Sequence, residues 1–401
     1  MSATYPPTFE EIALADSVAA WGAAVDGLAN WCAGVIERGA TPPELAVDWM
    51  RWWSSATTRR RPRWTSPNEV AFETPVARLR AFSTGERSRV VPTLVLPPQA
   101  GHDSCIVDFS PEQSQMRAIL AADLRPAYAL DWIGATASTK DSTIDDYMEV
   151  VDRAIEHVGG RVNLIGDCQG GWLATIYAGH HPERVNTLTI AGAPVDFHAG
   201  EPVIHAALKR LAPGGNLAFF RGLVAAGGGV LRGEHMLAAF IGMRPDNEIA
   251  RQLQLLSNLD DPVQLQRYRE FEDWFTYTQA IPGPFYLWIV EHLFRDNALI
   301  AGKLAVRGEH VDLGRIACPL NLLAGAADHI TPPDQVFALA DYATTPSEQI
   351  VRETAAGGHL GLFMGHEALR EHWPRLLAAV RRHSQLKAPI RGSVAQRALQ
   401  P

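Results

Sequence analysis

Short apolar stretches alternate with helical periods along the first half of the chain, and this alternation limits the fold more than any other feature. Strands are predicted over 76–82, 90–96, 127–132, 161–166 and 187–193, with a short extended piece over 105–109. Helices are predicted over 112–121, 144–158 and 171–180. Because strands joined through helices of this length run parallel, the pattern predicts a doubly wound, mostly parallel sheet of the α/β class.

The alternation stops after residue 193 and resumes only at predicted strands over 319–326 and 349–353. The stretch between contains helical periods and no convincing strand, which is typical of a helical cap inserted between two strands of a sheet. The predicted division is a core of 66–195 and 316–383, with a cap of 196–315.

Two helices, over 9–38 and 43–54, are predicted within an N-terminal helical segment of residues 1–65. Apolar residues in the first recur at three- and four-residue steps, the spacing of one helical face. The segment is rich in tryptophan: Trp21, Trp31, Trp49, Trp52, Trp53 and Trp64. We interpret it as packing on the core, with a partner or a particle surface as the alternatives.

The basic run 59–63 is interpreted as a solvated linker between the N-terminal segment and the core. The tail 384–401 carries basic residues and no acidic residue. We expect it to be frayed.

Composition excludes several classes of protein. The net charge is −8, and 47% of the 401 residues are hydrophobic, which argues against a nucleic-acid binder and against a disordered chain. The four cysteines are scattered, so neither a zinc site nor a disulfide framework is predicted. The start of the chain lacks the pattern of a signal peptide, and no apolar stretch is long enough to span a bilayer. We expect a cytoplasmic protein without metal.

The strongest chemical signal is Gly166-Asp167-Cys168-Gln169-Gly170-Gly171, where an apolar strand runs directly into a helix. This is the nucleophile elbow of the α/β-hydrolase fold with Cys in place of Ser. Gly166 and Gly170 let strand and helix approach closely, and the helix N-terminus directs N–H groups toward the thiolate. The alternative is a buried structural cysteine in a Gly-rich turn.

A thiol nucleophile requires a base and a residue that orients it, which follow in the order acid, then His. Asp328 comes just after the predicted strand 319–326, and His359 lies in a glycine-flanked loop after the last strand. Asp131, which also ends a strand, is the alternative acid. Of the other histidines, His180 and His181 are interpreted as a helix end and His366 as a surface position.

The backbone N–H of Gln169 is the first predicted oxyanion donor, and Ala100 or Gly101 in the loop after residue 96 is the predicted second. Asp167, Trp172 and His329 are possible substrate contacts. A loop role for His329 is an equal alternative. An ionised Asp167 would oppose thiolate formation unless it points away or is paired.

Beyond the elbow, the chain resembles the polyhydroxyalkanoate synthases, and most of all the short catalytic subunits of the two-component class (class III), from about residue 68 to 374. The resemblance is carried by Pro97-Pro98, VDFSPEQS at 107–114, LDW at 130–132, IDDY at 144–147, the elbow, FEDW at 271–274 with DN at 296–297, DHI at 328–330 and GHLG at 358–361.

The resemblance implies that (R)-3-hydroxyacyl-CoA acylates Cys168, with His359 as base and Asp328 assisting the incoming hydroxyl. The product would be a polyester, made without cofactor or metal at a granule surface by a homodimer or with a helper subunit. The alternatives are a cysteine-dependent esterase, thioesterase or polyester depolymerase of the same fold, and a non-catalytic granule-associated protein.

Overall fold

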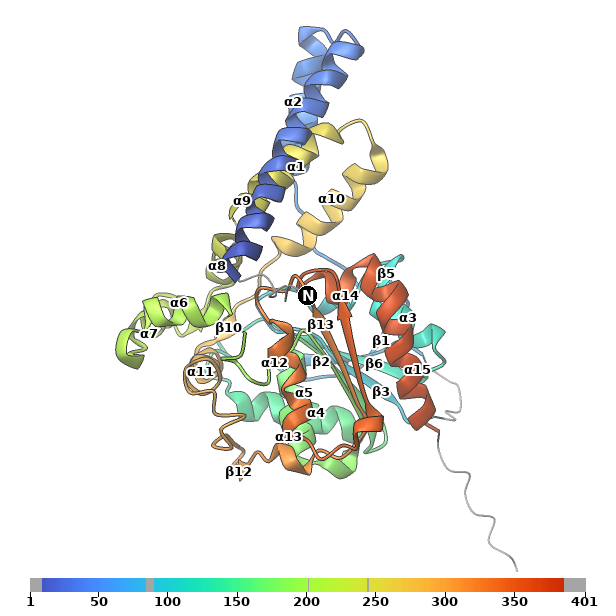
Figure 1. The fold of residues 1–401 in the computed structure, drawn as a ribbon, viewed down its shortest axis with the longest axis vertical. Helices are drawn as coiled ribbons and strands as arrows, with labels where there is room; N and C mark the ends of the chain where they lie inside the picture. The colour runs from blue at the N-terminus through green and yellow to red at the C-terminus, as the bar shows by residue number, and fades with distance from the viewer. Residues whose placement is uncertain (1–8, 84–89, 201, 244, 386–401) are drawn as a thin grey trace, which may run out of the picture.

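The computed structural model describes residues 9–83, 90–200, 202–243 and 245–385 (Figure 1). The first eight residues and nearly all of the tail predicted over 384–401 lie outside the described residues. Among the described residues, no helix is both long and apolar enough to cross a bilayer.

Eight strands form one sheet in the spatial order β1-β2-β6-β3-β7-β8-β13-β14. Their bounds are β1 (Glu69–Glu73), β2 (Ala77–Ala81), β3 (Thr93–Leu96), β6 (Ala127–Trp132), β7 (Val162–Asp167), β8 (Val185–Ala191), β13 (Leu320–Gly325) and β14 (Ile350–Ala355). Only β2 runs against the others. Numbered along the chain, the order is 1-2-4-3-5-6-7-8, which is the α/β-hydrolase topology. The predicted fold class is therefore confirmed. β1 is part of this eight-stranded sheet but was not predicted from the sequence.

Helices cover both faces of the sheet (Figure 1). One face carries α4 (Ile144–His157) and α5 (Gln169–His180), and the other carries α3 (Gln115–Ala121) and α15 (Trp373–His383). The four central strands β3, β7, β8 and β13 are buried along their whole length. Strands covered on both faces lose contact with water, which explains why apolar residues predominate in them.

Two predicted elements near residue 110 differ from the structure. Residues 105–109 were expected to be extended, but Ser104–Val107 form a 3₁₀ turn that leads into β4 (Asp108–Ser110). The next helix begins at Gln115 rather than at 112, because Ser114 caps it by accepting a hydrogen bond from the N–H of Arg117.

The segment between β8 and β13 is mainly helical. It contains α6 (Val203–Leu211), α7 (Ala218–Ala226), α8 (Gly233–Met243), α9 (Pro245–Ser257), α10 (Pro262–Phe275) and α11 (Gly283–Trp288), followed by a π-helical turn, Ile289–Arg295. The expectation of no strand is wrong in detail, because β9 (Val230–Leu231) pairs with β10 (Ile281–Pro282) and β11 (Ala305–Val306) with β12 (Glu309–His310).

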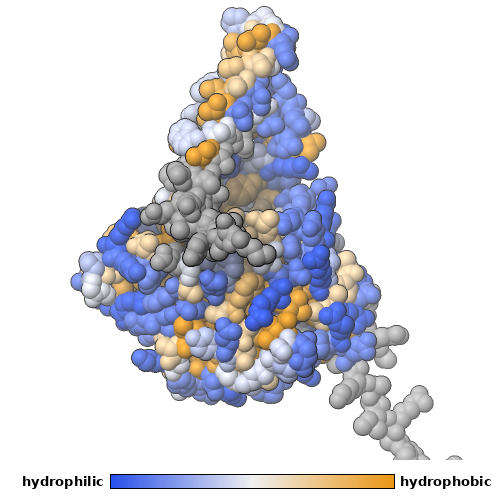
Figure 2. Space-filling view, in the orientation of Figure 1, coloured by the Kyte–Doolittle hydropathy of each residue, from blue (hydrophilic) through white to orange (hydrophobic). Residues whose placement is uncertain are grey.

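The N-terminal helices α1 (Phe9–Glu37) and α2 (Pro42–Thr57) project away from the sheet beside α9 and α10 (Figure 1). Trp21, Trp49 and Trp53 are 53%, 58% and 57% exposed, and Figure 2 shows apolar residues on the surface of this arm. The interpretation that the tryptophans pack on the catalytic domain is therefore wrong for these three. Val18, Val25 and Ile36 of α1 are exposed as well, although α9 packs along this helix.

The basic run 59–63 is only partly the solvated linker that was expected, because Arg60, Arg61 and Arg63 are exposed but Arg59 is held by the inserted helices. Arg59 forms an ion pair of 2.7 Å with Glu272 of α10, whose side chain is buried, and the backbone N–H of Arg60 donates to Asp273. Buried carboxylates require such partners. The run therefore joins the N-terminal arm to the inserted helices.

Candidate active site

Cys168 lies between the end of β7 and the start of α5, in a strained backbone conformation with φ +50° and ψ −117°. Its N–H donates to the carbonyl of Ala191 on β8 at 2.9 Å, and its carbonyl accepts from the N–H of Gly171 at 2.9 Å. A positive φ is unfavourable for a residue with a side chain. The neighbouring strand and helix hold this turn in place and leave the thiol half-buried at the carboxyl edge of the sheet.

Gly166 and Gly170 are required by close backbone contacts around the turn. A Cβ atom on Gly166 would lie 2.4 Å from the carbonyl oxygen of Gly170. On Gly170 it would lie 1.9 Å from the carbonyl oxygen of Leu96, at the end of β3. Both distances are far below van der Waals contact, so any side chain would push α5 away from the sheet.

His359 and Asp328 form a buried pair next to the elbow. The Nδ1 atom of His359 lies 2.7 Å from Oδ2 of Asp328, whose other oxygen accepts the N–H groups of Ile330 and Thr331 at 3.0 and 2.9 Å. A carboxylate held in this way selects the tautomer with the proton on Nδ1. The Nε2 atom of His359 is then free to accept a proton, and the Cys168 thiol hydrogen-bonds to this ring.

Electrostatics favour a charged imidazole in this position. Burial opposes protonation of the ring, but the Asp328 carboxylate and Cys168 outweigh it and hold the pKa of His359 well above its ordinary value. The N-terminus of α5 also directs positive partial charge toward the sulfur. The arrangement can therefore form a thiolate–imidazolium pair and attack a carbonyl carbon.

Asp167 is fully buried, and its environment determines whether its charge opposes thiolate formation at Cys168. One oxygen accepts a long hydrogen bond of 3.3 Å from Nε2 of Gln115, and the other has no partner among the described residues. Burial raises the pKa of Asp167 to about 8, although Gln115 and the charge of His359 oppose this. At neutral pH the side chain is therefore mostly protonated and places little negative charge beside the thiolate.

Replacing Asp167 with Asn tests this protonation state. The Asp167 carboxyl ionises near pH 3.8 in the unfolded chain and at about pH 8 in the folded protein. The stability that this group contributes is therefore fully present below about pH 4 and is lost as the pH rises to about 8. The loss amounts to at most about 6 kcal/mol. We expect the free energy of unfolding, measured in urea at pH 5 and pH 8, to fall less in Asp167→Asn than in the wild type. The exposed Asp341→Asn should retain the wild-type dependence, and equal slopes in all three proteins would contradict the assignment.

In the loop after β3, Gln99 lies beside the elbow residue Gln169. Pro97 and Gln99 line a small cleft together with Gln169, whereas Ala100 and Gly101 do not line it. Gly101 instead accepts a hydrogen bond of 2.7 Å from the N–H of Gln279, in the inserted segment. The two prolines at 97 and 98 carry no N–H, so Gln99 provides the first main-chain donor after the strand.

The remaining predicted site residues have distinct positions. Trp172 is 1% exposed, packs against Phe285 and Trp288, and lines the same cleft as Gln169. His329 is half-buried, and its carbonyl accepts from the N–H of Val203.

The alternative acid and base residues lie outside the pair formed by Asp328 and His359. Asp131 binds Arg80 at 2.7 Å instead of a histidine. His180 is the last residue of α5, as predicted, and is buried there. Within the described ranges, no cluster of three or more His, Cys, Asp or Glu side chains could hold a metal ion.

Aromatic residues of α10 join the apolar cluster that includes the elbow cysteine. Phe271 and Phe275 belong to the same apolar cluster as Cys168, and His102 stacks on Trp274 with ring centroids 4.9 Å apart. Burial lowers the pKa of His102 to about 4, so this ring stays neutral and apolar enough to join the stack. The inserted helices therefore contribute aromatic side chains to the apolar cluster that contains Cys168.

The positions of Gln99 and Gln115 next to the elbow residues Gln169 and Asp167 were not predicted from the sequence. Neither residue has a distinctive spacing relative to the elbow, because each arrives there through the fold. The position of Gln99 could have been found from the two prolines before it, which leave no earlier N–H group.

Comparison with known proteins places the chain in a family. A family model described as "Protein of unknown function (DUF3141)" matches residues 77–391. The chain is 25% identical over 278 residues to the "Poly(3-hydroxyalkanoate) polymerase subunit PhaC" of Allochromatium vinosum, covering 68% of this chain and 75% of that protein. It is 25% identical over 317 residues to the protein of the same name in Haloferax mediterranei, covering 77% of this chain and 62% of that protein.

Among solved structures, a hydrolase from Pseudomonas aeruginosa aligns with a TM-score of 0.47 and 20% identity, over 79% of this chain and 97% of that one. The polymerase relatives confirm the resemblance to the polyhydroxyalkanoate synthases noted in the sequence. Because the family model matches more than half of the chain, the chain belongs to the family described as "Protein of unknown function (DUF3141)".

Proposed function

We propose that this protein is an acyltransferase that polymerises (R)-3-hydroxyacyl-CoA into polyhydroxyalkanoate through an acyl-Cys168 intermediate. The observation that carries the proposal is the pairing of the elbow cysteine with His359 and Asp328, in a chain whose curated relatives are named poly(3-hydroxyalkanoate) polymerases. The predicted homodimer or helper subunit and the predicted cytoplasmic or granule-surface location stay predictions.

In the first half-reaction, Nε2 of His359 accepts the thiol proton and the sulfur attacks the thioester carbonyl. The resulting oxyanion accepts the backbone N–H of Gln169, with the N–H of Gln99 as our proposed second donor in place of Ala100 or Gly101. The carbon–sulfur bond to CoA then breaks. The departing CoA thiolate takes the proton from His359, and the acyl group remains on Cys168. One thioester has replaced another, so the step is nearly balanced in free energy.

In the second half-reaction, the hydroxyl group of another 3-hydroxyacyl unit attacks the acyl-Cys168 carbonyl. His359 accepts the hydroxyl proton while Asp328 stabilises the imidazolium that forms. The new ester bond forms as the carbon–sulfur bond breaks, and His359 returns the proton to the cysteine. The apolar cluster that contains Cys168, Phe271 and Phe275 supports transfer over hydrolysis, because apolar surroundings disfavour water next to the thioester.

The test is incubation of the purified protein with (R)-3-hydroxybutyryl-CoA, with free CoA and the acyl product both measured. We expect CoA release together with growing turbidity and polymer. CoA release with only soluble 3-hydroxybutyrate would assign the site to a thioesterase or esterase instead. If the wild-type protein neither releases CoA nor forms an acyl-enzyme detectable by mass spectrometry, the proposed reaction is wrong for this substrate.

A further inference from the structure

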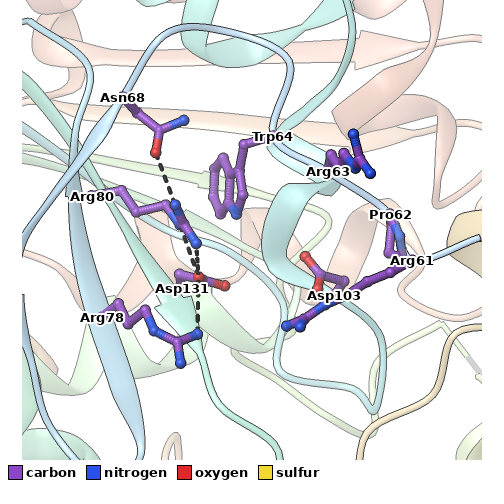
Figure 3. A pocket seen from close by; sticks show the side chains of 9 residues that line it. All are labelled: Arg61, Pro62, Arg63, Trp64, Asn68, Arg78, Arg80, Asp103 and Asp131. Carbon is purple, nitrogen blue, oxygen red and sulfur yellow. Dashed lines mark hydrogen bonds and ion pairs between the residues drawn. The ribbon is translucent and has the colours of Figure 1, made fainter.

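A second cavity, of about 420 Å³, opens beside β2 (Figure 3). Its walls come from the segment that follows α2, from β2, from the end of β6 and from the loop after β3. The residues that line it are Arg61, Pro62, Arg63, Trp64, Asn68, Arg78, Arg80, Asp103 and Asp131.

The cavity is positively charged in a protein whose net charge is negative. Its lining holds four arginines and two aspartates, and 4 − 2 leaves a charge of +2, against −8 for the whole chain. An excess of guanidinium groups around one cavity favours an anionic ligand, because guanidinium binds phosphate oxygens through paired hydrogen bonds.

Two of the four arginines, Arg78 and Arg80, are bound by other side chains of the protein. Arg80 donates from Nε to Asp131 at 2.8 Å and from Nη1 to Asn68 at 2.9 Å, and Arg78 binds Glu73 at 2.9 Å.

By contrast, Arg61 and Arg63 are exposed and form no ion pair within the described part of the chain. Arg61 lies over the ring of Tyr277, 5.6 Å from its centroid. Their charges therefore remain available to a ligand.

Trp64 adds an aromatic surface to the same cavity. Its ring is half-buried, lies 5.5 Å from the ring of Phe82, and has the guanidinium of Arg80 5.3 Å from its centroid. Figure 3 shows the indole between the arginines of β2 and those of the preceding segment. An aromatic ring next to unpaired cations suits a ligand that carries a planar base as well as phosphates.

The cavity lies close to the nucleophile. On β3, Val95 pairs with Ala129 of β6 on one side and with Ile165 of β7 on the other. Two residues further along each strand, Asp131 in the cavity wall is therefore level with Asp167, which precedes the cysteine. Two strand spacings place these backbones roughly 10 Å apart. An extended pantetheine arm is longer than that.

We propose that this cavity binds the nucleotide end of the CoA substrate, with its phosphates on Arg61 and Arg63 and its adenine against Trp64. The pantetheine arm then crosses the carboxyl edge of the sheet and delivers the thioester to Cys168. This assignment rests on the proposed function for its choice of ligand, but the cavity's charge and shape can be tested without catalysis.

The experiment is calorimetric titration of the full chain with adenosine 3′,5′-bisphosphate, which carries the adenine, the 3′-phosphate and one of the two 5′-phosphates of CoA without the thioester. We expect the Arg61→Ala, Arg63→Ala double variant to bind at least about 10-fold more weakly, since each charge-assisted contact contributes about 1.5–3 kcal/mol. Arg60→Ala is the matched control. It removes the same charge from the same run, its exposed side chain does not line the cavity, and affinity should stay within about 2-fold.

Three results would overturn the assignment. The first is that the wild type does not bind the nucleotide, and the second is that the double variant and Arg60→Ala lose the same amount of affinity. The third is that inorganic phosphate binds as tightly as the nucleotide, which would mark a site for free phosphate. Because binding does not require the thiol, the titration is repeated in Cys168→Ala. CoA release without nucleotide binding would overturn the cavity assignment alone, and binding without acyl-enzyme formation would overturn the proposed reaction alone.

Discussion

Cys168→Ala is expected to lower CoA release from (R)-3-hydroxybutyryl-CoA by at least about 10³-fold, because loss of a covalent nucleophile removes the whole acyl-transfer route. The sulfur is placed by a strained turn between β7 and α5 and is paired with His359, and neither feature can be supplied by a methyl group. The measurement is CoA release under saturating substrate, together with intact-protein mass spectrometry for the acyl adduct.

Cys32→Ala is the matched control for this experiment. Cys32 is exposed on α1, outside the apolar cluster that contains Cys168, so its loss should leave CoA release at the wild-type level. Equal release by Cys168→Ala and the wild type would show that the elbow cysteine is structural and would remove the basis of the proposed mechanism.

Gly170→Ala is expected to destabilise the folded protein by at least about 4 kcal/mol, which few single substitutions do. The added methyl group would lie 1.9 Å from the carbonyl oxygen of Leu96, and this contact is with backbone that cannot rotate away. Relief requires α5 to move from β3, which opens the buried layer between helix and sheet. The free energy of unfolding in urea measures the loss.

Gly222→Ala separates this contact from the general effect of adding a methyl group to a helix. Gly222 lies inside α7, and a Cβ atom there would meet nothing within 4 Å. We expect this variant to gain about 0.5–1 kcal/mol, because alanine is the better helix former. Similar small changes in both variants would mean that the elbow tolerates the side chain and that the close approach is not required.

The class of fold and the three residues proposed for catalysis could be predicted because local pattern carries them. Parallel strands buried on both faces are rich in apolar residues, so β6, β7 and β13 stand out in the sequence. The elbow is equally local, since strand, strained residue, glycines and helix are consecutive. Asp328 and His359 follow strand ends, and the carboxyl ends of parallel strands meet at one edge.

Other features depended on contacts between distant parts of the chain. The protonation state of Asp167 depends on burial beside Gln115, 52 residues away. The role of the basic run depends on α10, more than 200 residues further on, which supplies Glu272 and Asp273. Neither partner is marked by its neighbours in sequence.

The sequence by itself therefore determined the sheet, the elbow and the order of nucleophile, acid and base, because periodicity and strand ends are written within a few consecutive residues. Only the tertiary structure decided that Trp21 and Trp49 stay exposed on an arm, that Asp167 is buried beside the thiol, and that Arg61 and Arg63 share a cavity. The physical reason is that the burial and the charge state of a side chain depend on its contacts in space, and those contacts join segments that are far apart in the chain.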